Sequence, residues 1–210
     1  MCARIYYSVS VWSNMDTKAI SKILGPRFDA VSEDGARALQ ELALPADAAI
    51  LDVGTGNGNF AIYLASQGYQ VVTGEPSTDK SHYAGRDWAL NAKKVGVLDN
   101  IRFEAFDASE LPFESDAFDA VFFFGVLHHI GENVRTQVFR EALRVSKESG
   151  VVVFFEPRKE MLERIRVDDP GHPRAANPSN YLPDQRAGEL RIEGSLMDIF
   201  IYKKPATCLL

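Results

Sequence analysis

Residues 51–60 read Leu51-Asp52-Val53-Gly54-Thr55-Gly56-Asn57-Gly58-Asn59-Phe60. The apolar run that ends inside this segment, residues 48–53, predicts a buried strand, and the apolar spacing of residues 60–65 predicts a helix. Three glycines at alternate positions separate the two. They predict a tight turn in which the backbone can approach a ligand, because no Cβ stands in the way. Unpaired N–H groups at the start of the helix would face the same ligand. The turn is therefore predicted to bind a small molecule.

The residues on either side of the glycines indicate which kind of molecule. A phosphate-binding P-loop needs Gly-Lys-Ser/Thr at its end, and this turn has no lysine. A dinucleotide fingerprint needs a glycine three residues after Gly56, where the chain has Asn59. The carboxylate of Asp52, two residues before Gly54, would repel a pyrophosphate and attract an ammonium group. This pattern favours a zwitterionic amino-acid headgroup, and the alternative is an ordinary tight turn.

Apolar segments that predict strands alternate with segments of helical spacing through the middle of the chain. The predicted strands are 48–53, 69–73, 100–105, 117–124 and 151–155. One predicted helix follows the glycines and ends near residue 68, and the others span 78–95, 134–143 and 159–167. This alternation is typical of an α/β fold built on a parallel sheet with right-handed crossovers. Two further segments, 189–192 and 196–202, predict a closing hairpin.

The part of the chain before the first strand, residues 1–45, is predicted to form an N-terminal cap, and residues 46–204 the core of a single domain. Short helices are expected in the cap around residues 20–24 and 34–42. Its aromatic side chains suit either a lid over the substrate or a packing arm; they are Tyr6, Tyr7 and Trp12. A proline-rich stretch, 168–183, predicts an extended loop.

Residues 51–58 closely resemble motif I of class I S-adenosylmethionine (SAM)-dependent methyltransferases. Residues 106–113 are similar to that family's Asp-Ala-x-x-Leu-Pro-Phe segment. Residues 143–150 are similar to its Leu-Arg-x-Leu-Lys-Pro-Gly-Gly segment, with Glu148 and Ser149 in place of Pro and Gly. The resemblance covers about residues 48–156. It implies a Rossmann-like, seven-stranded, mostly parallel sheet with helices on both faces and an antiparallel C-terminal hairpin strand.

Such sheets bind ligands beyond the carboxyl ends of their strands. Glu75 follows the second strand, where a carboxylate can accept hydrogen bonds from both hydroxyls of a ribose; the alternative is a surface acid in a turn. The resemblance places the adenine amino group at Asp107, an adenine ring nitrogen at Ala108 and the methionine portion at Phe124 and Gly125. It implies a binding site for SAM, with S-adenosylhomocysteine as the product, formed by Asp52, Gly54, Thr55, Gly56, Asn59, Glu75, Pro76, Asp107, Ala108, Phe124 and Gly125.

The adjacent imidazoles of His128 and His129 are the candidate catalytic groups, because neutral imidazole accepts a proton near pH 7. A base is required only if the nucleophile arrives protonated. Neighbouring residues point in different directions, so at most one of the two is expected to face the cavity. The alternative is that both only line or pack the pocket. His82 and His172 lie in polar surroundings and are expected to be solvated, and no metal site is predicted.

Composition restricts the partners. The formal net charge is −6 and the pI is about 5.3, which argues against nucleic acid. Cys2 and Cys208 form neither a disulfide framework nor a metal-ligand cluster, which favours a cytoplasmic location. No apolar stretch approaches the length of a transmembrane helix, and the first residues lack the pattern of a signal peptide. A monomer or homodimer is expected.

The sequence thus predicts a SAM-dependent methyltransferase that transfers a methyl group by in-line displacement. A small-molecule acceptor is favoured because there is no extra domain and no basic surface. The N-terminal cap and residues 168–183 would frame this acceptor. The alternatives are a methyltransferase that acts on protein side chains and a non-catalytic SAM-binding module with a regulatory role.

Overall fold

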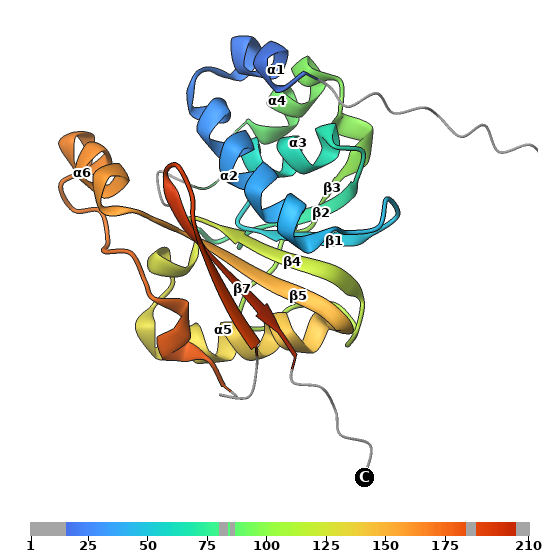
Figure 1. The fold of residues 1–210 in the computed structure, drawn as a ribbon, viewed down its shortest axis with the longest axis vertical. Helices are drawn as coiled ribbons and strands as arrows, with labels where there is room; N and C mark the ends of the chain where they lie inside the picture. The colour runs from blue at the N-terminus through green and yellow to red at the C-terminus, as the bar shows by residue number, and fades with distance from the viewer. Residues whose placement is uncertain (1–15, 80–83, 85–86, 184–187, 205–210) are drawn as a thin grey trace, which may run out of the picture.

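The computed structural model describes residues 16–79, 84, 87–183 and 188–204 (Figure 1). The predictions that lie outside these residues concern Cys2, Tyr6, Tyr7, Trp12, His82 and Cys208. A seven-stranded sheet forms the centre, in the order β3-β2-β1-β4-β5-β7-β6. Its strands are β1 Ala49–Val53, β2 Gln70–Gly74, β3 Ile101–Phe103, β4 Phe118–Phe124, β5 Ser146–Pro157, β6 Gly188–Glu193 and β7 Met197–Lys203.

The strand directions confirm the predicted fold class. Each neighbouring pair from β3 to β5 is parallel, whereas β7 is antiparallel to both β5 and β6. The chain builds outward from β1 to β3 and then returns to place β4 on the other side of β1. The strand order therefore reverses between β1 and β4, where the carboxyl ends of a parallel sheet leave a crevice for a ligand.

Helices cover both faces of this sheet, as predicted (Figure 1). One face carries α1 Thr17–Leu24, α2 Arg27–Leu42, α3 Asn59–Ser66 and α4 Trp88–Val95, and the other carries α5 Glu132–Val145. The helix α6 Lys159–Asp168 projects from one side. The short 3₁₀ turns are η1 Leu98–Asn100, η2 Leu127–His129 and η3 Pro178–Tyr181.

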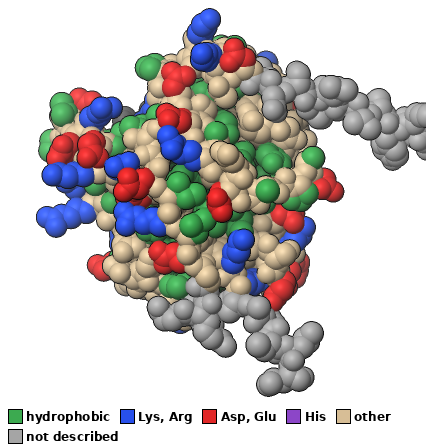
Figure 2. Space-filling view, in the orientation of Figure 1, with side chains coloured by type: hydrophobic (Ala, Val, Ile, Leu, Met, Phe, Trp, Pro, Cys, Tyr) green, Lys and Arg blue, Asp and Glu red, His purple; other side chains and the backbone are tan. Residues whose placement is uncertain are grey.

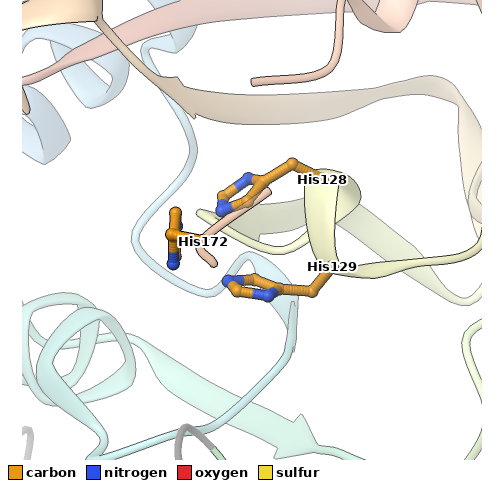
Figure 3. A group of neighbouring side chains, drawn as sticks. All are labelled: His128, His129 and His172. Atoms are coloured by element: carbon orange, nitrogen blue, oxygen red, sulfur yellow. The ribbon is translucent and has the colours of Figure 1, made fainter. Parts of the chain in front are cut away.

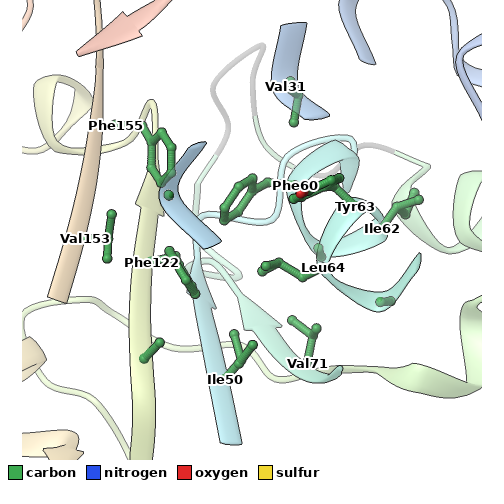
Figure 4. Packing of buried hydrophobic residues seen from close by; sticks show 14 of the residues in the cluster. Val31, Ile50, Phe60, Ile62, Tyr63, Leu64, Val71, Phe122, Val153 and Phe155 are labelled. Atoms are coloured by element: carbon green, nitrogen blue, oxygen red, sulfur yellow. The ribbon is translucent and has the colours of Figure 1, made fainter. Parts of the chain in front are cut away.

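Each strand contributes side chains to the hydrophobic cores on both faces of the sheet, because successive side chains point to opposite faces. On β4, Phe122 packs with the α3 side and its neighbour Phe123 with the α5 side. Figure 4 shows Phe60 and Leu64 of α3 beside Phe122, with Phe155 of β5 close by. The apolar run in β4 is thus buried on both sides, which is typical of a central parallel strand.

Two helices begin elsewhere than predicted. The helix α2 starts at Arg27, seven positions before the expected residue 34, because Phe28 and Val31 extend its buried stripe by two turns. The helix α4 is shorter than the predicted 78–95 and starts only at Trp88, where the apolar positions begin. Among the described residues, no helix combines the length and the apolar content needed to cross a bilayer.

One buried carboxylate ties α2 to the last hairpin. Asp34 is fully buried and accepts hydrogen bonds from the backbone N–H groups of Ser195, Leu196 and Met197, the latter two at 3.0 Å. Ser195 and Leu196 belong to the connection between β6 and β7, and Met197 is the first residue of β7. Asp34 therefore fixes the N-terminal helix against the C-terminal strand. The division into a cap, 1–45, and a core, 46–204, stays a prediction.

Candidate functional site

A cavity of about 700 Å³ lies at the carboxyl ends of the strands. One wall is made by the glycine turn after β1 and by the ends of β2 and β4. Further lining residues come from segments outside the first five strands: Arg27 and Val31 of α2, Met161 and Ile165 of α6, and His172 in the loop after α6. The cavity thus has a wall formed by the sheet edge and a wall formed by surrounding elements.

The turn after β1 has the conformation that its glycines allow. Gly54 has φ of 90°, in the left-handed region, and a Cβ at this position would overlap the side chain of Val126. The helix α3 starts directly after the turn, at Asn59, and its first residues line the cavity. The predicted strand–turn–helix unit is confirmed, and its backbone is open to a ligand.

The carboxylate of Glu75 is fastened to this turn. Its Oε2 accepts a hydrogen bond from the backbone N–H of Gly56 at 2.9 Å. The preceding residue, Gly74, has no room for a side chain, since a Cβ there would overlap the Glu104 carbonyl oxygen and the ring of Phe106. The segment after β3 therefore runs close against the end of β2. This contact brings Asp107 to the same cavity as Glu75.

Asp52 is the one predicted cofactor residue that does not line the cavity. It is 1% exposed and points to the face of the sheet covered by α3, since it shares the direction of Ile50. Its Oδ2 accepts a hydrogen bond from Thr73 Oγ1 at 2.8 Å, and Thr73 Oγ1 lies 2.9 Å from Thr55 Oγ1. Because Thr73 has a single hydroxyl proton, Thr55 donates to Thr73. Asp52 is connected to the cavity only through these two hydroxyls.

Burial raises the pKa of Asp52 to about 7, the Thr73 hydrogen bond opposes this shift, and the negative charge of Glu75 adds to it. The second carboxylate oxygen, Oδ1, is buried and has no hydrogen-bond partner among the described residues. An ionised Asp52 is thus poorly compensated in the folded state.

We expect Asp52→Asn to flatten the pH dependence of stability. The pKa of this carboxyl is higher in the folded than in the unfolded protein. Its contribution to the free energy of unfolding is therefore present at low pH and is lost as the pH rises through the folded pKa. Between pH 5 and 8 this loss amounts to about 2–3 kcal/mol in the wild type. Urea unfolding of both proteins at the two pH values measures it. Equal pH dependence in the two proteins would show that Asp52 does not titrate in this range.

The remaining predicted cofactor residues all line the cavity; they are Gly54, Thr55, Gly56, Asn59, Glu75, Pro76, Asp107, Ala108, Phe124 and Gly125. Asp107 also organises its own turn, since its Oδ1 accepts from the backbone N–H of Ser109 at 2.8 Å and from its hydroxyl at 2.7 Å. The carboxylate of Asp107 thus both organises the turn around Ser109 and lines the cavity.

Three imidazoles meet at the other end of the cavity (Figure 3). The ring centroids of His128 and His129 lie 4.2 Å apart, and that of His172 lies 5.2 Å from the first and 4.9 Å from the second. Nδ1 of His128 lies 3.0 and 3.1 Å from the two carboxylate oxygens of Glu156, a residue that is 2% exposed. Glu156 also accepts the backbone N–H of Ala176 at 2.8 Å. His128 is therefore held by a buried carboxylate.

Two predictions about these histidines are wrong. His172 is not solvated: it is 5% exposed, and its Nδ1 lies 3.2 Å from Asp169 Oδ2. The loop after α6 folds back over the end of β4. The polar residues next to His172 in the sequence do not predict this contact. His128 and His129 also both line the cavity, although only one was expected to. Their Cα–Cβ bonds diverge, but rotation about the side-chain bonds turns both rings toward His172.

For two of the rings, His129 and His172, the surroundings disfavour protonation. Loss of solvent in the cavity lowers the pKa of His129 to about 4, and the neighbouring His128 and His172 lower it further. Burial also lowers the pKa of His172. These two imidazoles are thus neutral near pH 7.

Glu156 is the functional candidate that sequence reasoning missed. It stands at the carboxyl end of β5, the same edge that supplies Glu75 and Asp107. An acid in an otherwise apolar strand, at the edge where ligands bind, was a usable signal. Arg27, Val31 and Met161 were also missed, and their positions on the cavity wall carry no comparable local signal.

A family model described as a methyltransferase domain matches residues 51–154, from β1 to β5. A curated protein, 27-O-demethylrifamycin SV methyltransferase of Amycolatopsis mediterranei (strain S699), is 38% identical over 109 residues. These residues are 52% of this chain and 38% of that protein, so the chain spans well under half the length of this relative.

Two solved structures share the fold. The PH0226 protein from Pyrococcus horikoshii OT3 has a TM-score of 0.69 at 20% identity, over 87% of this chain and 93% of that one. Geranyl diphosphate methyltransferase in complex with SAM has a TM-score of 0.61 at 13% identity, over 90% and 91%. The family model shows that residues 51–154 are a methyltransferase domain, and their fold is that of the class I SAM-dependent methyltransferases.

Proposed function

We propose that this protein transfers a methyl group from SAM to a small-molecule acceptor by in-line displacement inside the 700 Å³ cavity. One observation carries the proposal. The same cavity holds the glycine turn with Glu75 and Asp107 at one end, and the imidazole of His128 backed by Glu156 at the other. The first end suits a methyl donor, and the second suits the handling of an acceptor's proton.

The residues of the first end fit SAM. The turn lines the cavity with the backbone of Gly54 and Gly56, which carries no side chain to keep the methionine end of SAM away. Glu75 presents a carboxylate to the ribose hydroxyls, and Asp107 with the backbone N–H of Ala108 serves the adenine. The backbone at Phe124 and Gly125 would contact the methionine portion. A volume near 700 Å³ is within the range of about 300–1,000 Å³ typical of small-molecule pockets.

Asp52 does not line the cavity, so its effect on SAM binding would be indirect. We infer that it orients the Thr55 hydroxyl through Thr73, in place of the direct contact with an ammonium group that its sequence position favours. A positive ligand group near Thr55 would also favour the ionised form of Asp52.

The part of the cavity wall that we assign to the acceptor has the composition expected for binding a small, partly apolar molecule. It combines the apolar side chains of Val31, Met161 and Ile165 with the guanidinium of Arg27 and the three imidazoles. The acceptor-side residues from α2, α6 and the loop after α6 lie outside the matched segment 51–154. The name of the Amycolatopsis relative describes a methyltransferase that acts on 27-O-demethylrifamycin SV, a small molecule. This likeness favours the same class of acceptor here.

When bound, SAM supplies an electrophilic methyl group whose transfer removes charge. The chain then contributes mainly by alignment and by exclusion of water. The glycine turn and Glu75 hold the donor, while α2, α6 and His172 enclose the acceptor. With its Nδ1 committed to Glu156, the imidazole of His128 has its Nε2 to accept a proton from the nucleophile. His129 lies beside it and offers the same chemistry.

Calorimetry with SAM and with S-adenosylhomocysteine tests the donor end. We expect micromolar affinity for both, and neither heat nor a thermal shift would contradict the proposal. Incubation with labelled SAM and fractionated metabolite extracts then tests transfer. Release of S-adenosylhomocysteine with label in a small molecule is the expected result. Label in protein would point to a side-chain methyltransferase, and binding without release to a regulatory module.

A further inference from the structure

We propose that His128, His129 and His172 bind a divalent transition-metal ion such as Zn²⁺. One nitrogen from each ring lies within 4.8 Å of the others. Figure 3 shows the rings converging from two separate segments, η2 for His128 and His129 and the loop after α6 for His172. Ligand nitrogens about 2.0–2.1 Å from a tetrahedral ion are about 3.3 Å apart. Coordination would therefore draw the three nitrogens closer together than they lie here.

The carboxylates around the cluster have the arrangement that metal-binding histidines use. A histidine that binds a metal through one nitrogen usually donates the other N–H to a carboxylate or a carbonyl, which fixes the tautomer and the ring orientation. Here Nδ1 of His128 is bonded to Glu156, and Nδ1 of His172 to Asp169. Both rings would therefore coordinate through Nε2.

The outer carboxylates are themselves held in place. Glu156 is buried and accepts the Ala176 N–H, and Asp169 directly follows the last turn of α6. The backbone N–H of His172 donates to the Asp169 carbonyl at 3.1 Å, which closes the turn between them. Two carboxylates beside three imidazoles would balance the charge of a divalent ion without entering its first shell.

The set of ligands indicates which ion is bound. Imidazole suits Zn²⁺, Cu²⁺, Fe²⁺ and Ni²⁺, whereas Mg²⁺ and Ca²⁺ prefer oxygen ligands. Three histidines leave at least one coordination position open, as in catalytic zinc sites. Because all three residues line the cavity, we place that open position toward the acceptor.

The role of the ion rests on the proposed function, whereas its binding does not. A hydroxyl or thiol of the acceptor would occupy the open position and lose its proton to solvent, because the ion lowers the pKa of a bound group. The oxygen or sulfur anion then forms a bond to the methyl carbon. The bond from that carbon to the sulfonium breaks, and its electron pair stays on sulfur. The ion would thereby do the work assigned above to the His128 imidazole alone, and the acceptor would be an alcohol, a phenol or a thiol.

Titration of the chelator-treated wild-type protein with Zn²⁺, followed by calorimetry, tests the site directly. Co²⁺ serves as a second probe, since its visible absorption reports coordination geometry. We expect one ion per chain, and His172→Gln should lower the affinity at least tenfold. Unchanged affinity for S-adenosylhomocysteine in that variant would show that it is folded.

Two neighbouring acids give a matched pair of variants. Asp169→Asn alters the partner of His172 and should lower Zn²⁺ affinity about 10–100-fold. Asp168→Asn, one residue earlier and exposed, should leave it unchanged. Failure of the wild type to bind Zn²⁺ or Co²⁺ would overturn the inference, as would equal affinity in His172→Gln. Methyl transfer by metal-free protein would refute the metal's catalytic role while sparing the proposed function.

Discussion

Glu156→Ala is expected to lower the free energy of unfolding by about 2–5 kcal/mol and to remove most of the methyl transfer. The substitution leaves two buried donors without an acceptor, Nδ1 of His128 and the backbone N–H of Ala176, and each costs about 1–3 kcal/mol. It also releases the ring that faces the acceptor. Urea unfolding gives the first quantity, and release of S-adenosylhomocysteine the second.

The kinetic constants of the variants distinguish a positioning role of Glu156 from a purely structural one. At a temperature where Glu156→Ala is folded, its kcat should fall while its affinity for S-adenosylhomocysteine stays within about threefold of wild type. Such a change in the binding free energy is well under about 1.4 kcal/mol. Glu156→Gln keeps the shape and one acceptor oxygen, so it should recover most of the stability and little of the turnover. The exposed Glu160→Gln is the matched control and should match wild type. Wild-type kcat in Glu156→Ala would exclude the role.

Glu75→Ala is expected to weaken SAM binding by about 1–3 kcal/mol, or roughly 5–150-fold. The carboxylate is lost as a partner for the ribose hydroxyls and as the anchor of the Gly56 N–H, so the glycine turn loosens as well. Calorimetry with SAM measures the change. Unchanged affinity would contradict both the ribose contact and a role of the Gly56 anchor in binding.

Asp107→Ala tests a second contact, which does not involve the glycine turn. Its carboxylate bonds to Ser109 and to no part of the glycine turn, so a comparable loss of affinity would come from the adenine contact. Glu110→Ala is the control, because Glu110 lies exposed on the same turn and does not line the cavity. Equal affinity in Asp107→Ala and Glu110→Ala would contradict the adenine assignment.

The sequence predicted the sheet because burial leaves a local pattern. The strand β4 is buried on both faces and is apolar from Ala120 to Phe124, while α5 is buried on one face and shows helical spacing. The grouping of the residues proposed to bind SAM was predictable for the same reason. Its residues stand at strand ends that can be found along the chain, and the parallel topology brings those ends together without further information.

The acceptor end depends on contacts between distant segments. Nothing near His172 indicates that it meets His128, more than forty residues earlier, and its polar neighbours predicted a solvated side chain. The start of α2 was missed because Phe28 and Val31 look isolated until the helix is laid on the sheet. The position of Asp52 could have been predicted, since alternation along β1 places it on the same face as Ile50.

The carboxylate of Asp34 has a consequence for synthesis on the ribosome. Its partners, Ser195 to Met197, are made 161 to 163 residues later. At about 5–20 residues per second, roughly 10–30 s pass before they exist. During that interval the strands β1 to β5 and the glycine turn emerge, while α2 lacks its final attachment. The nascent protein thus completes the strand ends that are proposed to bind SAM before α2 is attached to the last hairpin.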